Sequence, residues 1–228
     1  MNDAPFLSLT NIRAGYEGSE VLTGLSIEVN PGEVVALLGR NGMGKSTTVS
    51  VIAGTLGRNS GDIRIAGQDV SSSRPSTRYA AGLRVVRQDQ PVFGQLSVTE
   101  NLGLVGCRGT ARAAAIFPFL ANRGRQAAGT LSGGEQKLLA IARTAVEPGR
   151  LWVLDEPTEG LQPANVDRCA GLISEAAQRG IAVLLVEQHL EMAMSISARW
   201  YLLEKGQVVD SGRTTPESEA AIARHMAI

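Results

Sequence analysis

The sequence is poor in cysteine and in aromatic residues, and neither sign of charge is in excess. Its 228 residues include two cysteines, Cys107 and Cys169, which stand far apart and outside any CxxC or Cys/His spacing. This usage argues against a disulfide framework or a cysteine-ligated metal, and it predicts two reduced, inert thiols in a reducing compartment. Lysine plus arginine and aspartate plus glutamate each total 22, whereas nucleic-acid binders usually carry a basic excess. The charge balance therefore predicts no nucleic-acid partner.

Long hydrophobic runs are missing as well. The longest apolar stretches, such as 34–38 and 181–186, are far shorter than the roughly 18 residues that a membrane-spanning helix requires. The N-terminal sequence MNDAPFLSLT has neither the basic region nor the apolar core of a secretory signal. We therefore expect a soluble, cytoplasmic chain that reaches a membrane only through partner subunits.

The composition that remains is globular, with 43% hydrophobic and 19% charged residues. A chain of this length suits one domain, with room for a small subdomain. Short β-branched runs alternate with helical patterns, which predicts an α/β fold with a mostly parallel sheet and helices on both faces. We expect strands at 6–13, 25–29, 33–38, 63–66, 83–86, 151–155, 181–187, 200–204 and 208–210, and helices at 45–53, 134–146, 163–179 and 190–198.

One stretch has a different character. Residues 97–129 are rich in alanine, glycine and arginine, contain Pro118 and lack β-branched runs. We expect this stretch to form a small helical subdomain. The whole of 1–228 would then be a single domain whose catalytic core comprises 1–96 and 130–228.

The strongest motif is a glycine-rich loop that begins at Gly39. Its sequence, GRNGMGKST, matches G-x-x-x-x-G-K-[ST] directly after a predicted strand and before a predicted helix. The glycines let several backbone N–H groups point inward, and the helix N-terminus adds partial positive charge, so the loop is suited to phosphate. Lys45 would reach the β- and γ-phosphates, and the Ser46 hydroxyl would bind Mg²⁺. The nucleotide-binding candidates in this loop are Gly39, Asn41, Gly42, Gly44, Lys45, Ser46 and Thr47.

A second motif is an apolar strand that ends in two acids, LWVLDEP, at 151–157. Adjacent carboxylates at the end of a buried strand repel each other unless a cation offsets the charge. We expect Asp155 to hold Mg²⁺ through water and Glu156 to act as the general base that polarises the attacking water. The alternative is a strand end whose acids only face solvent.

A third motif is LSGGEQ at 131–136, which presents a serine and two glycines before a predicted helix. Backbone donors at a helix N-terminus make a second anion site, although Ser132 would also serve as an ordinary helix N-cap. The motif resembles the LSGGQ or LSGGE signature of the ABC ATPase family. The resemblance implies a P-loop NTPase fold of the ABC type with an N-terminal antiparallel β-subdomain. It also implies that two subunits sandwich two ATP molecules, with Ser132, Gly133, Gly134 and Glu135 completing the partner's site.

Two single residues match further positions of this family. Tyr16 precedes the glycine-rich loop where the family keeps an aromatic that stacks on adenine, although it could instead belong to the core. Gln88 follows the predicted strand 83–86 at the distance of the family's glutamine loop. The resemblance implies that Gln88 touches Mg²⁺ and the attacking water, and that its loop lines the contact with membrane subunits.

Two positions depart from the general family pattern. The family has a switch histidine after the strand that follows the catalytic acids, but here that strand ends Glu187-Gln188-His189. Counting from Glu187 favours Gln188 as the residue that senses the γ-phosphate, with His189 as the alternative. The loop after Glu156 has Gln162 where the family has the aspartate that communicates across the dimer.

These departures resemble one subfamily, the second ATPase of branched-chain amino-acid importers, whose relatives serve urea and short amides. The resemblance implies ATP and Mg²⁺ as cofactors and a location at the inner face of the membrane. It also implies several partners: a second ATPase subunit, two membrane permeases and, indirectly, a solute-binding protein. Two alternatives remain open, namely an ABC ATPase that serves no transporter and a regulatory subunit that hydrolyses ATP weakly.

Overall fold

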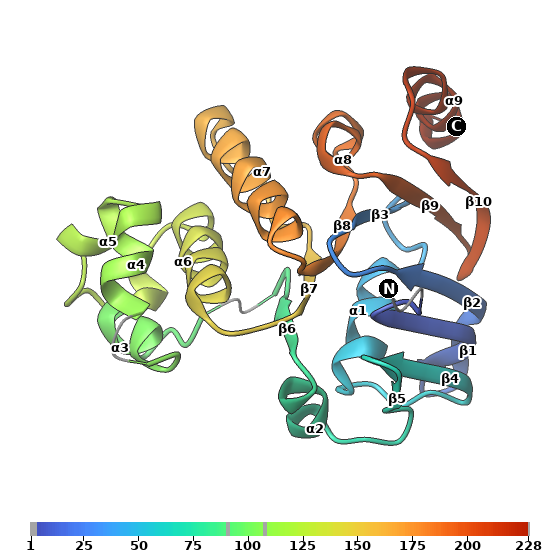
Figure 1. The fold of residues 1–228 in the computed structure, drawn as a ribbon, viewed down its shortest axis with the longest axis horizontal. Helices are drawn as coiled ribbons and strands as arrows, with labels where there is room; N and C mark the ends of the chain where they lie inside the picture. Colours follow the sequence, from blue (N-terminus) through green and yellow to red (C-terminus); the bar gives the residue numbers. More distant parts are fainter. Residues whose placement is uncertain (1–3, 90–91, 107–108, 228) are drawn as a thin grey trace.

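The computed structural model describes residues 4–89, 92–106 and 109–227. Within them a six-stranded sheet has the order β10-β9-β3-β8-β7-β6, and a four-stranded sheet has the order β2-β1-β4-β5. Figure 1 shows the two sheets at the right of the molecule and a separate group of helices at the left. The mixed α/β architecture with a mostly parallel core sheet agrees with the sequence prediction.

The core sheet is parallel except at one edge. Its parallel strands are β3 (Val34–Leu38), β6 (Leu83–Val86), β7 (Leu151–Asp155), β8 (Ala182–Glu187) and β9 (Arg199–Glu204), and β10 (Gln207–Arg213) is antiparallel. All residues of β3, β7 and β8 are buried, as expected for parallel strands covered on both faces. The glycine-rich loop and the two acids Asp155 and Glu156 therefore leave the same, carboxyl-terminal edge of the sheet.

Alternate side chains of β3 face two different cores. Val35 and Leu37 join a cluster with the antiparallel sheet and the helix α1 (Lys45–Ala53), while Ala36 and Leu38 join a cluster with helices on the other face. This division follows from the two-residue period of a strand. The helices that contribute to the second cluster are α6 (Gly133–Val146), through Ala140, together with α7 (Pro163–Gln178), α8 (Leu190–Ile196) and α9 (Pro216–Ala227).

The antiparallel sheet is built on one long hairpin. Its strands are β1 (Leu7–Tyr16), β2 (Ser19–Val29), β4 (Ser60–Ile65) and β5 (Gln68–Asp69). The sequence prediction placed strands only at 6–13 and 25–29, because residues 19–24, with the sequence SEVLTG, lack a continuous apolar pattern. The hairpin continues to its tip at Tyr16 and Ser19, and it brings β2 alongside the phosphate loop.

The helical group contains α3 (Val98–Gly103), α4 (Gly109–Ile116), α5 (Phe119–Asn122), a 3₁₀ turn (Ala128–Thr130) and α6 (Gly133–Val146). Its apolar core draws Leu102 from α3, Phe117, and Leu139 from α6 into one cluster. Because α6 shares this core, the helical group extends past residue 129 in packing terms. The boundary at 97–129 remains a prediction of the sequence.

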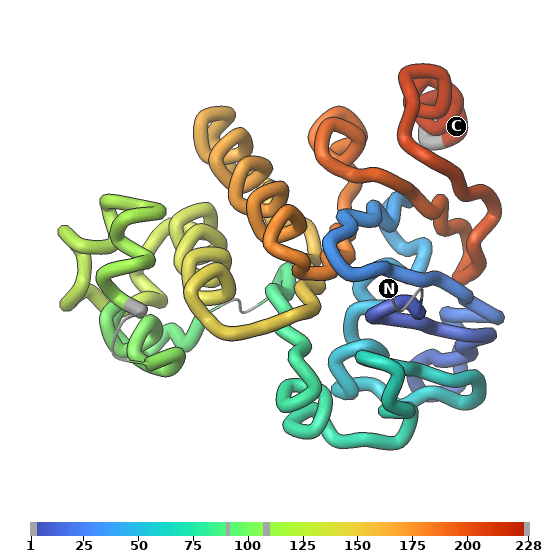
Figure 2. Tube along the Cα trace, in the orientation of Figure 1, coloured from blue at the N-terminus to red at the C-terminus, as the bar shows by residue number. Residues whose placement is uncertain are grey.

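Two helices escaped sequence prediction. The short α2 (Pro75–Ala80) has a polar sequence, and it is fixed by Arg78, whose guanidinium donates to the Ile52 carbonyl over 2.9 Å. The C-terminal α9 is anchored mainly through Ile222, and Figure 2 shows it at the end of the chain, beyond β10.

Two composition-based expectations can be set against the structure. Cys169 is a buried free thiol whose pKa is raised to about 12 by burial, so it is inert, while Cys107 lies outside the described residues. Within the three described ranges, no helix has both the length and the apolar character that crossing a bilayer demands.

Candidate functional site

The glycine-rich loop wraps around the amine of Lys45. Lys45 Nζ donates to the carbonyl oxygens of Gly39 and Arg40 over 2.8 and 3.2 Å. Gly44 has a φ of 105°, and a Cβ there would approach Leu22 Cδ2 to 2.9 Å, so only glycine fits between the loop and β2. The loop candidates divide into buried residues (Gly39, Gly44, Lys45 and Thr47) and exposed ones (Asn41, Gly42 and Ser46).

Asp155 ends β7 with its side chain buried beside Ser46. Burial raises the pKa of Asp155 to about 6, while a hydrogen bond with Ser46 acts in the opposite direction. Among the described residues no hydrogen-bond partner reaches Asp155 Oδ1. A buried carboxylate oxygen without a partner, next to a hydroxyl, is a set of hard oxygen donors that fits Mg²⁺. Such an ion would supply the positive charge that offsets the phosphates and the two acids.

Glu156 follows at once and has a strained backbone. Its φ of 47° lies in the left-handed region, which costs about 1–3 kcal/mol for a residue other than glycine. The backbone is held there by the N–H of Glu156, which donates to the Val186 carbonyl over 2.9 Å. Its carboxylate lies 3.3 Å from Lys45 Nζ, and both side chains are about 5% exposed or less. This backbone conformation therefore orients the Glu156 carboxylate toward Lys45 of the glycine-rich loop.

Gln88 joins the same cluster from the loop after β6. Its Nε2 donates to Glu156 Oε2 over 2.9 Å and to Glu159 Oε2 over 3.1 Å. Lys137 of α6 reaches the cluster as well, since its Nζ donates to the same Glu159 Oε2 over 3.0 Å. The loop after β6 and the helix α6 thus both contact the two carboxylates of Glu156 and Glu159 or the loop that carries them.

Ser132 caps α6 through a reciprocal pair of bonds. Its Oγ accepts from Glu135 N over 3.3 Å, and Glu135 Oε2 accepts from Ser132 N over 3.0 Å. The ordinary N-cap role considered for Ser132 is therefore present. Ser132 and Gly133 are exposed, and Gly134 and Glu135 are half-buried. In Figure 1 the helix α6 lies well apart from α1, so one subunit does not bring its signature residues to its own phosphate loop.

Tyr16 lies at the tip of the β1–β2 hairpin and is 56% exposed, so it is not a core residue. It lines an open cavity of about 420 Å³ together with Glu17, Gly18 and Asn59. Along the same hairpin, Leu22 of β2 is the residue nearest to Gly44. Its exposure leaves the ring free to stack on a base, and its role in adenine binding remains a prediction.

The switch region begins beyond the end of β8. Glu187 is the last strand residue and is fully buried, and its carboxylate accepts from Thr158 Oγ1 over 2.7 Å and from Gln188 N over 3.2 Å. Gln188 is half-buried and His189 is exposed. Because both residues lie after the strand, strand alternation does not decide which side chain faces the phosphate. The pKa of Glu159, in the neighbouring loop, is lowered, and the main cause is the hydrogen bond from Lys137.

Sequence reasoning missed three residues of this cluster. Lys137 and Glu159 attracted no attention because neither belongs to the matched motifs. Glu187 served only as a counting point, although an acid at the end of an apolar strand is itself a signal of a buried hydrogen-bonding role. For Lys137 the comparable signal is its position: it is a charged residue five positions after the helix cap Ser132, at the end of α6 that faces the site.

Comparisons with known proteins agree on one family. Residues 22–159 match the family model for the ABC transporter. The chain is 36% identical over 211 residues to the high-affinity branched-chain amino acid transport ATP-binding protein BraG of Pseudomonas aeruginosa, covering 89% of this chain and 91% of that protein. It is 29% identical over 241 residues to the ribose import ATP-binding protein RbsA 2 of Mesorhizobium japonicum, covering 99% of this chain and 48% of that protein.

A solved structure agrees with the sequence comparisons. The fold matches the crystal structure of the ADP conformation of MJ1267, an ATP-binding cassette of an ABC transporter, with a TM-score of 0.81 and 28% identity. The match covers 96% of this chain and 95% of that one.

Proposed function

We propose, from the premise that this chain belongs to the ABC transporter family, that it energises the import of branched-chain amino acids or a related small polar solute. The chain is an ATPase of that family. The observation that carries the proposed site is the convergence of Lys45 and Gln88 on the carboxylate of Glu156, at 3.3 and 2.9 Å. In this proposal Glu156 orients and deprotonates the attacking water, and Lys45 binds the phosphates.

The second half of each ATP site comes from a partner subunit. Ser132 and Gly133 are exposed at the N-terminus of α6, where backbone N–H groups and the helix dipole favour an anion. Since α6 lies apart from α1 in one chain (Figure 1), the anion would be the γ-phosphate held by the partner. The partner is a second copy of this chain or a homologous ATPase.

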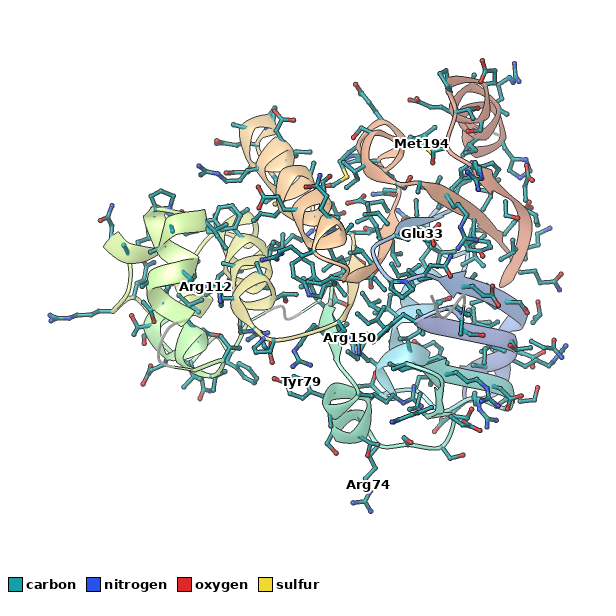
Figure 3. All side chains as sticks on the ribbon, in the orientation of Figure 1. Glu33, Arg74, Tyr79, Arg112, Arg150 and Met194 are labelled. Atoms are coloured by element: carbon teal, nitrogen blue, oxygen red, sulfur yellow. The ribbon has the colours of Figure 1, made fainter. Side chains whose placement is uncertain are left out.

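A membrane permease would dock in the groove between the core and the helical group. This groove has a volume of about 590 Å³, and its lining includes Tyr79, Arg87, Phe93 and Leu104. Three of these side chains are about half exposed or more, namely Tyr79, Phe93 and Leu104, and Figure 3 shows Tyr79 projecting from α2 toward the helical group. Arg87 is the residue before Gln88, which donates a hydrogen bond to Glu156. An occupant of the groove that contacts Arg87 would therefore lie next to the proposed catalytic cluster. That continuity favours a permease segment as the occupant.

The solute class rests on the likeness to BraG at 36% identity over most of both chains. The likeness to a ribose import protein, at 29% identity, is the reason to test a sugar beside an amino acid. A role as a weakly hydrolysing regulatory subunit is disfavoured because Lys45, Glu156 and Ser132 are all in place.

The test uses the chain reconstituted in liposomes with two permease subunits and a solute-binding protein of the branched-chain amino-acid type. We expect ATP-dependent uptake of radiolabelled leucine, no uptake of ribose, and loss of uptake in Glu156→Gln with ATP binding retained. Hydrolysis that the membrane subunits do not stimulate would contradict a transport role. Uptake of ribose and not leucine would overturn the solute class alone.

A further inference from the structure

One carboxylate oxygen joins three segments that lie far apart in the sequence. Glu159 Oε2 accepts from Gln88 Nε2 over 3.1 Å and from Lys137 Nζ over 3.0 Å. Gln88 belongs to the loop after β6, Glu159 to the loop after β7, and Lys137 to α6. The two bonds lower the pKa of Glu159, with the bond from Lys137 as the larger cause, so the carboxylate is charged at neutral pH.

Lys137 also holds the backbone of the catalytic loop. Besides the Glu159 carboxylate, its Nζ donates to the carbonyl oxygen of Glu156 over 3.2 Å and to that of Glu159 over 2.9 Å. All three donor positions of the ammonium are thereby used, and the side chain is 12% exposed. Glu156 is the residue with the left-handed φ of 47°. Lys137 therefore stabilises the strained backbone of Glu156, which orients the proposed general base.

Lys137 stands on the same rigid element as the signature residues. Helix α6 begins at Gly133 with Ser132 as its cap, so Lys137 lies just over one turn from the cap. The side chain of Lys137 is fixed at both ends, by the helix and by the loop. If the N-terminus of α6 moves relative to the core, it must either break these three hydrogen bonds or move the loop of Glu156 and Glu159 with it.

We propose that Lys137 and Glu159 are positioning residues that couple the two ATP sites of the dimer inside each subunit. At one end of this contact, Ser132 would act on the partner's ATP, and at the other, Glu156 and Gln88 would act on the subunit's own ATP. Closure of the partner's site on the α6 N-terminus then sets the general base of the first site. The coupling rests on the proposed function. It would provide communication between the two sites in a chain that has Gln162 where the family has the aspartate for that role.

The first test measures kcat, KM, equilibrium binding of ATP with Mg²⁺, and Tm for Glu159→Gln, Lys137→Met, the double variant and Lys137→Arg. We expect kcat to fall at least about tenfold in each of the first two, with the Kd for ATP within about twofold of the parent, because positioning acts on the transition state. The double variant should be no slower than the worse single variant, since both changes break one contact. Lys137→Arg, which keeps a donor, should recover part of kcat.

A matched control is Glu175→Gln, which removes the same charge from an exposed position on α7 and should leave kcat unchanged. A kcat within about twofold of the parent in Glu159→Gln, or losses that multiply in the double variant, would overturn the proposal. If Glu159→Gln does not fold, the comparison of Lys137→Met with Lys137→Arg decides instead. A parent chain without ATPase activity, both alone and with a homologous partner ATPase, would refute the proposed function, which is a separate outcome.

The second test separates coupling from local positioning in a dimer with one intact site. A Lys45→Ala subunit supplies Ser132 to that site, and a Ser132→Arg subunit supplies Lys45 and Glu156. Glu159→Gln is then placed in one subunit or the other. We expect turnover to fall in both arrangements, because the contact also fixes α6 of the subunit that donates the signature. A fall only in the subunit that donates Glu156 would overturn the coupling.

Discussion

Gln88 Nε2 donates to Glu156 Oε2 over 2.9 Å, although 68 residues separate them in the sequence. The contact exists because β6 and β7 are neighbouring parallel strands, so the loops that follow them leave the same edge of the sheet. It places a neutral amide donor on the carboxylate that we propose as the general base. Gln88 and Glu156 are therefore fixed relative to each other.

Replacing Gln88 should slow hydrolysis more than it weakens nucleotide binding. Gln88→Ala removes a hydrogen bond to a charged group, worth about 1.5–3 kcal/mol, so we expect kcat to fall about 10- to 100-fold. The Kd for ATP should change little, because Lys45 and the glycine-rich loop are untouched. Single-turnover hydrolysis and equilibrium binding measure the two quantities. Gln178→Ala, at the exposed end of α7, is the control, and a shift in Kd without a change in kcat would contradict the assignment.

The charged side chain of Asp155 should lower the stability of the metal-free chain while providing Mg²⁺ binding. Burial disfavours the charged carboxylate and raises its pKa to about 6, so Asp155→Asn should make the chain more stable in EDTA while abolishing Mg²⁺-dependent turnover. Urea unfolding in EDTA and ATPase assays across a Mg²⁺ series measure the two effects. A variant that keeps the Mg²⁺ affinity of the parent would show that Asp155 is not a ligand.

The γ-phosphate sensor is decided by comparing Gln188→Ala with His189→Ala. We expect the larger loss of kcat in Gln188→Ala, because Gln188 is half-buried next to the buried Glu187 while His189 is exposed. The measurement is steady-state hydrolysis at saturating Mg·ATP. If only His189→Ala abolishes hydrolysis, the assignment of Gln188 is wrong.

The pair Glu33–Arg199 predicts a pH-dependent part of the stability. Burial alone would raise the pKa of Glu33, but hydrogen bonds from Arg199 and Asn30 outweigh it and hold the pKa below its ordinary value. A lowered pKa means that the stabilisation is complete above the unfolded-state pKa and is lost as the pH falls through the folded-state pKa. Glu33→Gln should therefore cost about 1–3 kcal/mol at pH 7 and much less near pH 3. Urea unfolding at several pH values tests this, and an equal loss at every pH would contradict it.

Much of the fold was predictable because its strands carry unambiguous patterns. The apolar runs that became β3 and β7 lead directly into the motif residues, so Lys45, Asp155 and Glu156 could be placed at or after the ends of predicted strands. Helix α2 and the outer half of the β1–β2 hairpin could not be predicted. Their stability comes from tertiary contacts, such as Arg78 on the carbonyls of α1, and not from a local pattern.

The site shows the same division. Motif spacing pointed to Gln88, and the structure brings it to Glu156. The Lys137–Glu159 contact was not predictable, because it depends on how α6 packs on the loop after β7, and no short-range pattern encodes that packing. The end of β8 is a third case: strand alternation cannot assign Gln188 or His189, because β8 ends at Glu187 and both residues follow it.

The central claim is that each ATP site takes Lys45 and Glu156 from one subunit and Ser132 from the other. The direct measurement is ATPase activity of Lys45→Ala and Ser132→Arg, each alone and mixed in equal amounts. Each variant alone should be inactive. Since half of the mixed dimers would carry one intact site, the mixture should recover at most about a quarter of the parent activity, and less to the extent that the inactive site is coupled to the intact one. A mixture no more active than its components, when the parent chain alone hydrolyses ATP, would contradict the account.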